Sequence, residues 1–191
     1  MDLQIMMGDL TSISVSNLNM CSYNMYGFSN GAHTAKSLCL NHDIVMLQEH
    51  WLSNNNLNKL NTIHNDFSVV GVSSMESKIE SGLLCGRPFG GTAIMWNRSL
   101  GSCIKILEKD DNNGKYVCIR LSDDAIDIII TCVYLPYFRQ NNDYIVETSL
   151  ILAHIESILD KYPECSHIVG ETSIFSVCLR VKGSPCLRTY Y

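Results

Sequence analysis

Short apolar runs alternate with polar turns along most of this chain, and the period of the runs differs from one to the next. The segments that predict β-strands are 18–25, 44–47, 67–72, 92–96, 102–108, 116–121, 126–134 and 167–170. Apolar residues recur at helical spacing over 31–41 and 142–160, and Ser53 is placed to cap a further, weak helix. Tight turns between the strands from 92 to 134 predict antiparallel hairpins, so the pattern indicates an α+β sandwich.

Two segments depart from this alternation. The stretch 73–88 is polar, contains two glycines and a proline, and leads into Gly90-Gly91; so long a loop in a compact domain is usually functional or mobile. After Gly170 the chain changes from acidic to basic and shows no clear period. We therefore predict an N-terminal extension over 1–17, one domain over 18–170, and a tail over 171–191 that lies outside the preceding fold.

The composition narrows the class of protein. A chain of 191 residues with 46% hydrophobic and 17% charged residues is typical of one globular domain, which excludes a disordered or collagen-like chain. The net charge of −5 argues against coating nucleic acid by bulk charge, although it permits a local basic groove. We expect an intracellular protein without a membrane partner, because no apolar run reaches the ~20 residues of a membrane span and no secretory signal is recognisable.

Nine cysteines are scattered along the chain without any C-x-x-C pair. This spacing does not support a zinc site, and it predicts small buried hydrophobes in a reducing compartment. All six histidines precede Gly170, and we interpret them as structural or surface residues.

Polar residues that follow apolar strands are the candidates for chemistry. Asn24 ends the first strand, Glu49 follows the second, Tyr134 ends the longest one and Glu171 follows the last. Strand ends at one edge of a layered fold can converge, and a carboxylate with an amide suits Mg²⁺, which keeps waters for a phosphate. Taken singly, each has a structural alternative: a turn residue for Asn24, an exposed charge for Glu49 and a half-buried aromatic for Tyr134.

Together, these residues and their surroundings resemble the endonuclease/exonuclease/phosphatase superfamily, and within it the endonuclease domain of LINE-type (non-LTR) retrotransposons. The matching segments, in family order, are SYNMYGF (22–28), DIVMLQEHWL (43–52), ESGLLCGRPFGGTAIMW (80–96) and VYLPY (133–137). LQEHWL together with GRPFGG is fairly specific to the retrotransposon branch, as against repair endonucleases or lipid and inositol phosphatases.

The resemblance implies a four-layer α/β/β/α sandwich that hydrolyses phosphodiesters with Mg²⁺. Members of this branch nick target DNA, which places them in the nucleus, and the full-length element adds a reverse transcriptase domain. Carried over residue by residue, Glu49 is the principal metal ligand, Asn24 lies beside it to place metal or phosphate, and Tyr134 contacts the scissile phosphate. Arg87, in the long loop, is a candidate contact to DNA phosphate, with shaping of the strand entry as the alternative.

The second half of the family pattern is altered in this sequence. Where the family has Gly-Asp-Phe-Asn, the chain reads Gly170-Glu171-Thr172-Ser173, so Glu171 is a doubtful substitute for the aspartate that activates water. The family also has a later aspartate and a terminal Ser-Asp-His, and no aspartate or histidine follows Gly170.

Because one general acid–base group typically contributes ~10²–10⁴-fold to the rate, we predict that cleavage by this chain is weak or absent. The sequence then represents a C-terminally truncated or frameshifted element. Two alternatives stay open: a non-catalytic remnant that binds metal or nucleic acid weakly, and a phosphodiesterase of another branch of the superfamily.

Overall fold

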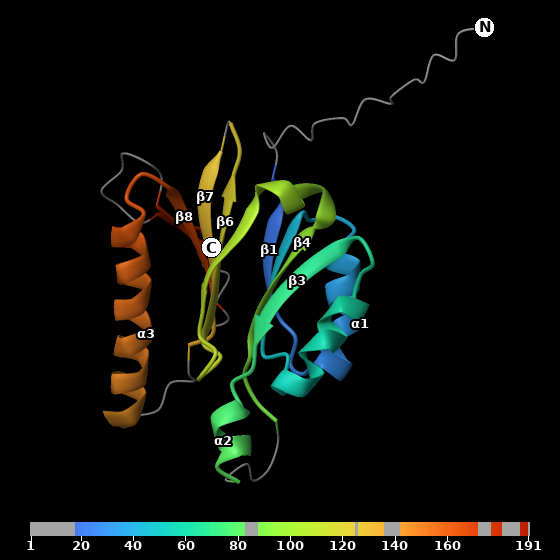
Figure 1. Ribbon diagram of the computed structural model, residues 1–191, viewed down its shortest axis with the longest axis vertical. Coiled ribbons are helices and arrows are strands. Elements are labelled where there is room, and N and C mark those ends of the chain that lie inside the picture. The colour runs from blue at the N-terminus through green and yellow to red at the C-terminus, as the bar shows by residue number, and fades with distance from the viewer. Residues whose placement is uncertain are drawn as a thin grey trace, which may run out of the picture.

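The computed structural model describes part of the chain. It covers residues 18–82, 88–124, 126–135 and 142–171, with side chains from Tyr144 onward in the last of these ranges, and the backbone of 177–180 and 188–190. Two β-sheets lie face to face, and a helix covers the outer side of each (Figure 1). The predicted four-layer α/β/β/α sandwich is therefore confirmed.

The first sheet is built around a parallel crossover. Its strands, in spatial order, are β1 (Met20–Asn24), β2 (Ile44–Gln48), β4 (Thr92–Asn97) and β3 (Phe67–Val72). Helix α1 (Phe28–Leu38) joins β1 to β2, so these two strands run parallel, whereas β4 is antiparallel to β2 and β3. All five residues of β2 are buried, which explains why this strand appears in the sequence as a continuous apolar run.

The second sheet begins with the predicted hairpins. Its strands are β5 (Ile104–Lys109), β6 (Tyr116–Ser122), β7 (Asp127–Val133), β8 (Ser166–Gly170), β9 (Val177–Arg180) and β10 (Arg188–Tyr190), and their spatial order is β10-β9-β8-β7-β6-β5. The pairs β5/β6 and β6/β7 are antiparallel, as the turns predict. Helix α3 (Asn142–Lys161) carries the chain from β7 to the parallel strand β8. Strands β9 and β10, which lie in the segment predicted to be outside the fold, extend this sheet beyond β8. The domain boundaries at 17 and 170 stay predictions.

The core lies between the two sheets. Met46 and Ile94 from the first sheet pack with Ile119 and Ile130 from the second, and all four side chains are fully buried. A second cluster lies between the first sheet and α1, and a smaller one lies between the second sheet and α3. No helix in the described ranges is long and apolar enough to cross a membrane.

Three local elements differ from the sequence-based expectation. The segment after Ser53 is a 3-10 helix, η2 (Asn54–Thr62), and the Ser53 side chain makes no capping hydrogen bond to its backbone. A second 3-10 helix, η3 (Arg98–Cys103), delays the start of β5. The segment predicted as a loop over 73–88 contains a short helix, α2 (Glu76–Glu80). Periodicity does not separate such short elements from loops, because each is only one to three turns long.

Candidate functional site

The carboxyl ends of four strands meet at one edge of the sandwich. Strand β1 is parallel to β2 and β7 is parallel to β8, so each pair presents its two ends on the same side. The Gln48 side chain at the end of β2 reaches the other sheet, where its Nε2 lies 3.2 Å from Cys132 Sγ. A Cβ atom added to Gly170 would lie 2.5 Å from Met46 Sδ, so the end of β8 is close to β2 as well.

Asn24 and Glu49 lie side by side at this edge. The segments that contain them continue the pairing of β1 and β2 through three backbone hydrogen bonds: Met25 N to the Gln48 carbonyl at 2.9 Å, Gly27 N to the Glu49 carbonyl at 2.8 Å and Phe28 N to the His50 carbonyl at 2.9 Å. The Asn24 Oδ1 atom accepts the N–H of Tyr26 at 2.9 Å, which fixes the orientation of the amide. Both side chains are partly exposed and therefore accessible from solvent.

The backbone around Glu49 is strained. Three residues other than glycine have a positive φ in the described ranges, and they are Tyr26 at 52°, Glu49 at 54° and Trp51 at 58°. The left-handed conformation costs roughly 1–2 kcal/mol per residue with a Cβ. Such strain persists only where surrounding contacts impose it, and it concentrates at functional sites. Its clustering on both sides of the Glu49 carboxylate marks this edge as the candidate site.

His50 holds this strained segment from inside. Its Nδ1 accepts the N–H of Leu52 at 3.0 Å, which leaves Nε2 to donate to the Val72 carbonyl at 3.0 Å. The side chain is fully buried, and burial lowers its pKa to about 4, so the imidazole is neutral at physiological pH. His50 is therefore a structural histidine, as predicted.

The last two glycines of the GRPFGG segment, Gly90 and Gly91, pack directly on the LQEHWL segment. A Cβ at Gly91, whose φ is +88°, would lie 2.4 Å from His50 Cε1. The Gly90 carbonyl accepts the N–H of Trp51 at 3.0 Å. Only residues without a side chain allow this close approach. The two motifs that are far apart in the sequence thus form one structural unit around Glu49.

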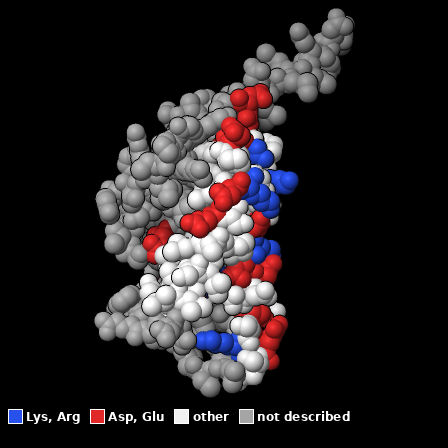
Figure 2. Space-filling view, turned by 90° about the vertical axis from the view of Figure 1, so that its left-hand side faces the viewer, with Lys and Arg blue, Asp and Glu red and all other residues white. Residues whose placement is uncertain are grey.

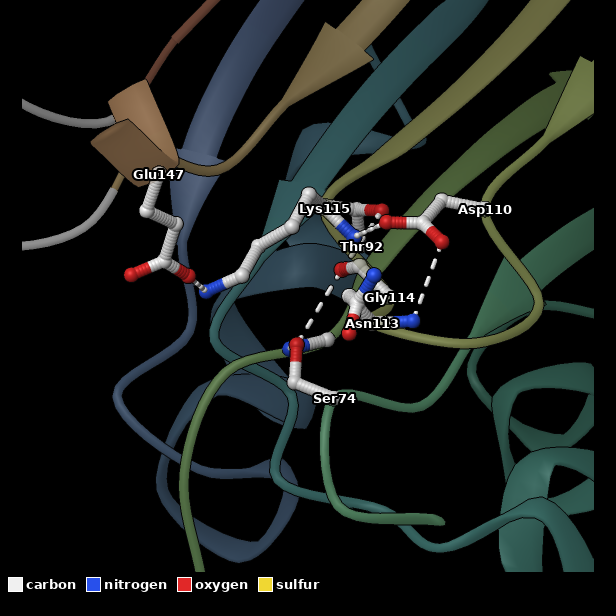
Figure 3. A network of polar contacts seen from close by, with 8 residues as sticks. Ser74, Thr92, Asp110, Asn113, Gly114, Lys115 and Glu147 are labelled. Atoms are coloured by element: carbon white, nitrogen blue, oxygen red, sulfur yellow. Dashed lines mark hydrogen bonds and ion pairs between the residues drawn. The ribbon is translucent and has the colours of Figure 1, made fainter. Parts of the chain in front are cut away.

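Tyr134 joins the site from the second sheet. Its N–H donates to the Lys115 carbonyl at 2.7 Å, and the Lys115 ammonium lies 5.1 Å from the centre of its ring. A Cβ at Gly90 would lie 3.4 Å from Tyr134 Cε1, so the tyrosine ring contacts the segment that also binds Trp51. Lys115 continues to helix α3, where it forms a 2.8 Å ion pair with Glu147 (Figure 3).

A polar network beneath Tyr134 was not found by the sequence analysis. The Ser74 hydroxyl accepts the N–H of Gly91 at 2.7 Å and donates to the Gly114 carbonyl at 3.1 Å (Figure 3). The Thr92 hydroxyl donates to the same carbonyl at 3.4 Å. These bonds connect the β5–β6 turn to the glycines beside His50. The only sequence signal is the turn DDNNG, which predicts a hairpin but not its partner.

Gln48 is a second residue that the sequence analysis missed. Its amide nitrogen donates to Ser22 Oγ at 2.8 Å as well as to Cys132 Sγ, so it links β1, β2 and β7. Its Oε1 atom is buried without a hydrogen-bond partner among the described residues. This glutamine ends the apolar run IVMLQ, and the charged residue Glu49 that follows it was the candidate selected from the sequence.

The structure gives less information about two predicted site residues, Glu171 and Arg87. Glu171 is partly exposed and directly follows β8. Strand β8 pairs with β7, the strand that leads to Tyr134. The prediction for Arg87 falls outside the described residues.

The donor set suits a cation that needs few protein ligands. Within the described residues, no group of three or more His, Cys, Asp or Glu side chains is placed to hold a metal ion. Mg²⁺ is commonly bound by one or two carboxylates, keeps several waters and binds phosphate oxygens. The partly exposed carboxylate of Glu49, with the amide of Asn24 beside it, fits that mode of binding.

Charge is mixed on the face of the molecule that carries α3. Figure 2 shows Lys and Arg side chains interspersed with Asp and Glu along one side of this face, and its described residues do not form a broad basic patch. Arg120, for example, is paired with Asp127, with 2.7 Å between Nε and Oδ1. A polyanion bound by charge alone would gain little on this face.

No protein-family model matches this sequence, and neither does any curated protein sequence. Solved structures do match the fold. AP endonuclease LMAP from Leishmania major has a TM-score of 0.60 at 13% identity, over 81% of this chain and 54% of that chain. The 3′ phosphatase NExo from Neisseria, solved with a product DNA hairpin, has a TM-score of 0.57 at 13% identity, over 81% of this chain and 57% of that chain.

An endonuclease/exonuclease/phosphatase family protein from Bacteroides thetaiotaomicron has a TM-score of 0.53 at 14% identity, over 81% of this chain and 62% of that chain. These structural neighbours are members of the endonuclease/exonuclease/phosphatase superfamily, and the chain has their fold. It spans less than two thirds of the length of each.

Proposed function

We propose that this chain is a Mg²⁺-dependent phosphodiester hydrolase domain that acts on DNA, and that Glu49 is its metal ligand. One observation carries the proposal: the backbone segments of Asn24 and Glu49 are hydrogen-bonded side by side, with a left-handed backbone at Glu49, at the edge where the strands leading to Tyr134 and Glu171 also end. The fold shared with nucleases and phosphatases supports the same chemistry, although a fold alone does not determine an activity.

Each residue at this edge has a separate role in the proposed hydrolysis. Bound Mg²⁺ would stabilise the charge that develops on the phosphate and the leaving oxygen. Asn24, with its amide orientation fixed by the Tyr26 N–H, donates its NH₂ group to a phosphate oxygen. The Tyr134 hydroxyl donates to the scissile phosphate from the opposite sheet. Glu171 is the carboxylate available to accept a proton from water, and Arg87 is a further contact to DNA phosphate.

We expect this hydrolysis to be slow. Glu171 extends one methylene farther than the aspartate that the family pattern has at this position. A displaced general base is expected to supply only part of the ~10²–10⁴-fold that acid–base catalysis typically contributes. The rate then rests mainly on the positioning of metal and phosphate.

The proposed source is a LINE-type retrotransposon, whose nuclear nicking step supplies a DNA end to a reverse transcriptase domain. The packing of LQEHWL on the glycines of GRPFGG supports a shared role for the two motifs that carry this resemblance. Reading the encoding DNA in all frames beyond codon 170 tests the idea. A Gly-Asp-Phe-Asn continuation and a reverse transcriptase frame are expected, and their absence counts against this source.

Another branch of the superfamily is the second candidate, because NExo is named as a phosphatase although it shares the fold. The two candidates differ in the bond that they break. A nuclease hydrolyses the diester bis-p-nitrophenyl phosphate and plasmid DNA, whereas a monoesterase hydrolyses p-nitrophenyl phosphate. Hydrolysis of the monoester alone would favour the phosphatase branch.

Nicking of supercoiled plasmid tests the proposed activity. In Mg²⁺, the chain is expected to convert supercoiled plasmid slowly to the open circle, and EDTA is expected to abolish the conversion. Glu49→Gln removes the carboxylate charge at nearly constant size, so nicking should fall at least ~10²-fold. Glu156→Gln, on the exposed side of α3, is the matched control and should nick at the unchanged rate. Nicking that persists in Glu49→Gln would overturn the assignment.

A further inference from the structure

Two aromatic side chains stand next to Glu49 and have no part in the proposed hydrolysis. The ring centres of Tyr26 and Trp51 are 5.4 Å apart, with an angle of 49° between the ring planes. Tyr26 is 59% exposed and is the only aromatic among the large hydrophobic side chains that are exposed in the described residues. Tyr26 is thus an exposed aromatic that contacts a second ring beside the candidate site, which sets it apart from the exposed aliphatic side chains of the described residues.

The pair is tied to the Glu49 segment on both sides. Trp51 lies two residues beyond Glu49, a span of at most roughly 7 Å along the chain. Tyr26 precedes Gly27, whose N–H donates to the Glu49 carbonyl at 2.8 Å. Because successive bases of a nucleic-acid strand are about 3.4 Å apart, a phosphate bound at Glu49 would bring the next one or two bases to these rings.

The position of the Trp51 ring is fixed by backbone contacts. A Cβ at Gly27 would lie 2.5 Å from Trp51 Cε3, so the indole lies directly on the glycine backbone. The Trp51 N–H donates to the Gly90 carbonyl at 3.0 Å. Both aromatic residues also adopt a positive φ, at 52° and 58°. The left-handed backbone conformation therefore occurs at Glu49 and at both aromatic residues beside it.

We propose that Tyr26 and Trp51 form a stacking platform for a nucleobase adjacent to the phosphate bound at Glu49. This inference rests on the proposed function and narrows its substrate class to nucleic acid with an unpaired base at that point. Flat aromatic rings bind the face of any base without regard to sequence. A sugar phosphate or an inositol phosphate has no flat aromatic face and would not stack on the pair as a base does.

Charge makes stacking the more useful source of affinity in this chain. Its net charge is −5, and acidic side chains interrupt the basic ones on the α3 face (Figure 2). Release of counterions by clustered lysines and arginines dominates most DNA binding and fails at high salt. A base held on Tyr26 and Trp51 would depend much less on salt.

The test compares two ligands that share their phosphates and differ in their bases. Fluorescein-labelled dT₁₀ and an abasic strand of the same length are titrated with the full chain in Ca²⁺, a hard cation that takes the same oxygen ligands as Mg²⁺, and anisotropy reports binding. We expect dT₁₀ to bind roughly tenfold more tightly than the abasic strand. Tyr26→Ala should abolish the difference, whereas Tyr26→Phe should retain it. Leu40→Ala removes another exposed apolar side chain, which is 72% exposed and lies after α1, and should change nothing.

The outcomes separate this inference from the proposed function. Equal affinity for the two strands, or no binding of either, overturns the stacking platform even if Glu49-dependent nicking is observed. A dT₁₀ preference that survives in Tyr26→Ala overturns it as well. A Tyr26-dependent preference for dT₁₀ supports the stacking platform even if no nicking is observed. In that case, the absence of nicking refutes the hydrolase proposal separately.

Discussion

The position of Glu49 is fixed by its buried, neutral neighbour His50. The His50 imidazole bonds with the backbone on both sides, and its ring fills the space left by the absent Cβ of Gly91. These contacts determine the direction of the chain on either side of Glu49. They also explain how three left-handed residues are tolerated within one short region.

The state of His50 makes stability depend on pH. Its pKa is lowered from 6.5 to about 4 by burial, so the unfolded chain binds a proton between these values while the folded chain does not. Stability is therefore full above pH 6.5 and decreases as the pH falls toward 4, by about 3 kcal/mol for this group. Urea unfolding of the wild type and of His50→Gln at pH 7 and pH 4.5 measures the difference.

His50→Gln is the appropriate comparison because its amide still donates to the Val72 carbonyl and does not titrate. The wild type should lose more stability than this variant over the same pH interval. Parallel losses in the two proteins would show that other groups cause the acid sensitivity and that His50 titrates normally.

Asn24, Glu49 and Tyr134 were predictable as candidates because each follows an apolar strand in the sequence. Their side-by-side placement rests on the backbone hydrogen bonds after β1 and β2 and on the contact of Tyr134 with Gly90. Gln48 was not predictable, since its partners Ser22 and Cys132 are 26 and 84 residues away. Long-range contacts of this kind leave no local pattern, and the roles of Asn24, Glu49, Tyr134 and Glu171 stay predictions.

At the scale of elements, the β5–β6 turn is the part that holds Tyr134. Asp110 closes this turn by accepting the N–H of Asn113 at 2.9 Å and the N–H of Lys115 at 3.2 Å. The Lys115 carbonyl in turn accepts the Tyr134 N–H at 2.7 Å. Gly114 permits the close contact with Ser73, because a Cβ there would lie 2.3 Å from a backbone carbon.

Removal of the turn carboxylate should affect stability and activity together. Asp110→Ala leaves two backbone N–H groups without their acceptor, which should cost about 1–2 kcal/mol of unfolding free energy. It should also reduce nicking, because the support of Tyr134 is loosened. Urea denaturation and plasmid nicking provide the two measurements.

Asp111→Ala is the matched control for this turn. Asp111 forms an ion pair with the exposed Lys109, and such surface pairs contribute little. Its stability and nicking should therefore equal those of the wild type. Equal stability in Asp110→Ala and Asp111→Ala would contradict the role of the Asp110 hydrogen bonds.

Most of the long elements were predictable from the apolar pattern, and the short ones were not. Helix α3 and strand β3 follow their predicted segments closely because each has a sustained period. Helix η2 and helix α2 are too short for a period to be read, and their conformation depends on contacts such as that of Asn54 N with Glu76 Oε2 at 3.1 Å. The pairing order of the strands likewise required the structure.

At the scale of the whole molecule, the candidate site depends on the two sheets being held in register. Gln48 reaches from β2 to Cys132 in β7, and the Cys132 thiol donates to the Leu47 carbonyl at 3.4 Å. Burial raises the pKa of this thiol to about 12, so it remains a donor. One sheet then supplies Asn24 and Glu49, and the other supplies Tyr134 and Glu171.

The central claim is that this shared edge binds a divalent cation at Glu49. The most direct measurement is Mn²⁺ titration of the ¹⁵N-labelled chain, since bound Mn²⁺ broadens the NMR signals of nearby amides. The account predicts broadening centred on Glu49, the Asn24 side-chain amide and Gly27, reversed by excess Mg²⁺ and lost in Glu49→Gln but not in Glu156→Gln. Broadening centred elsewhere, or broadening that is unchanged in Glu49→Gln, would contradict it.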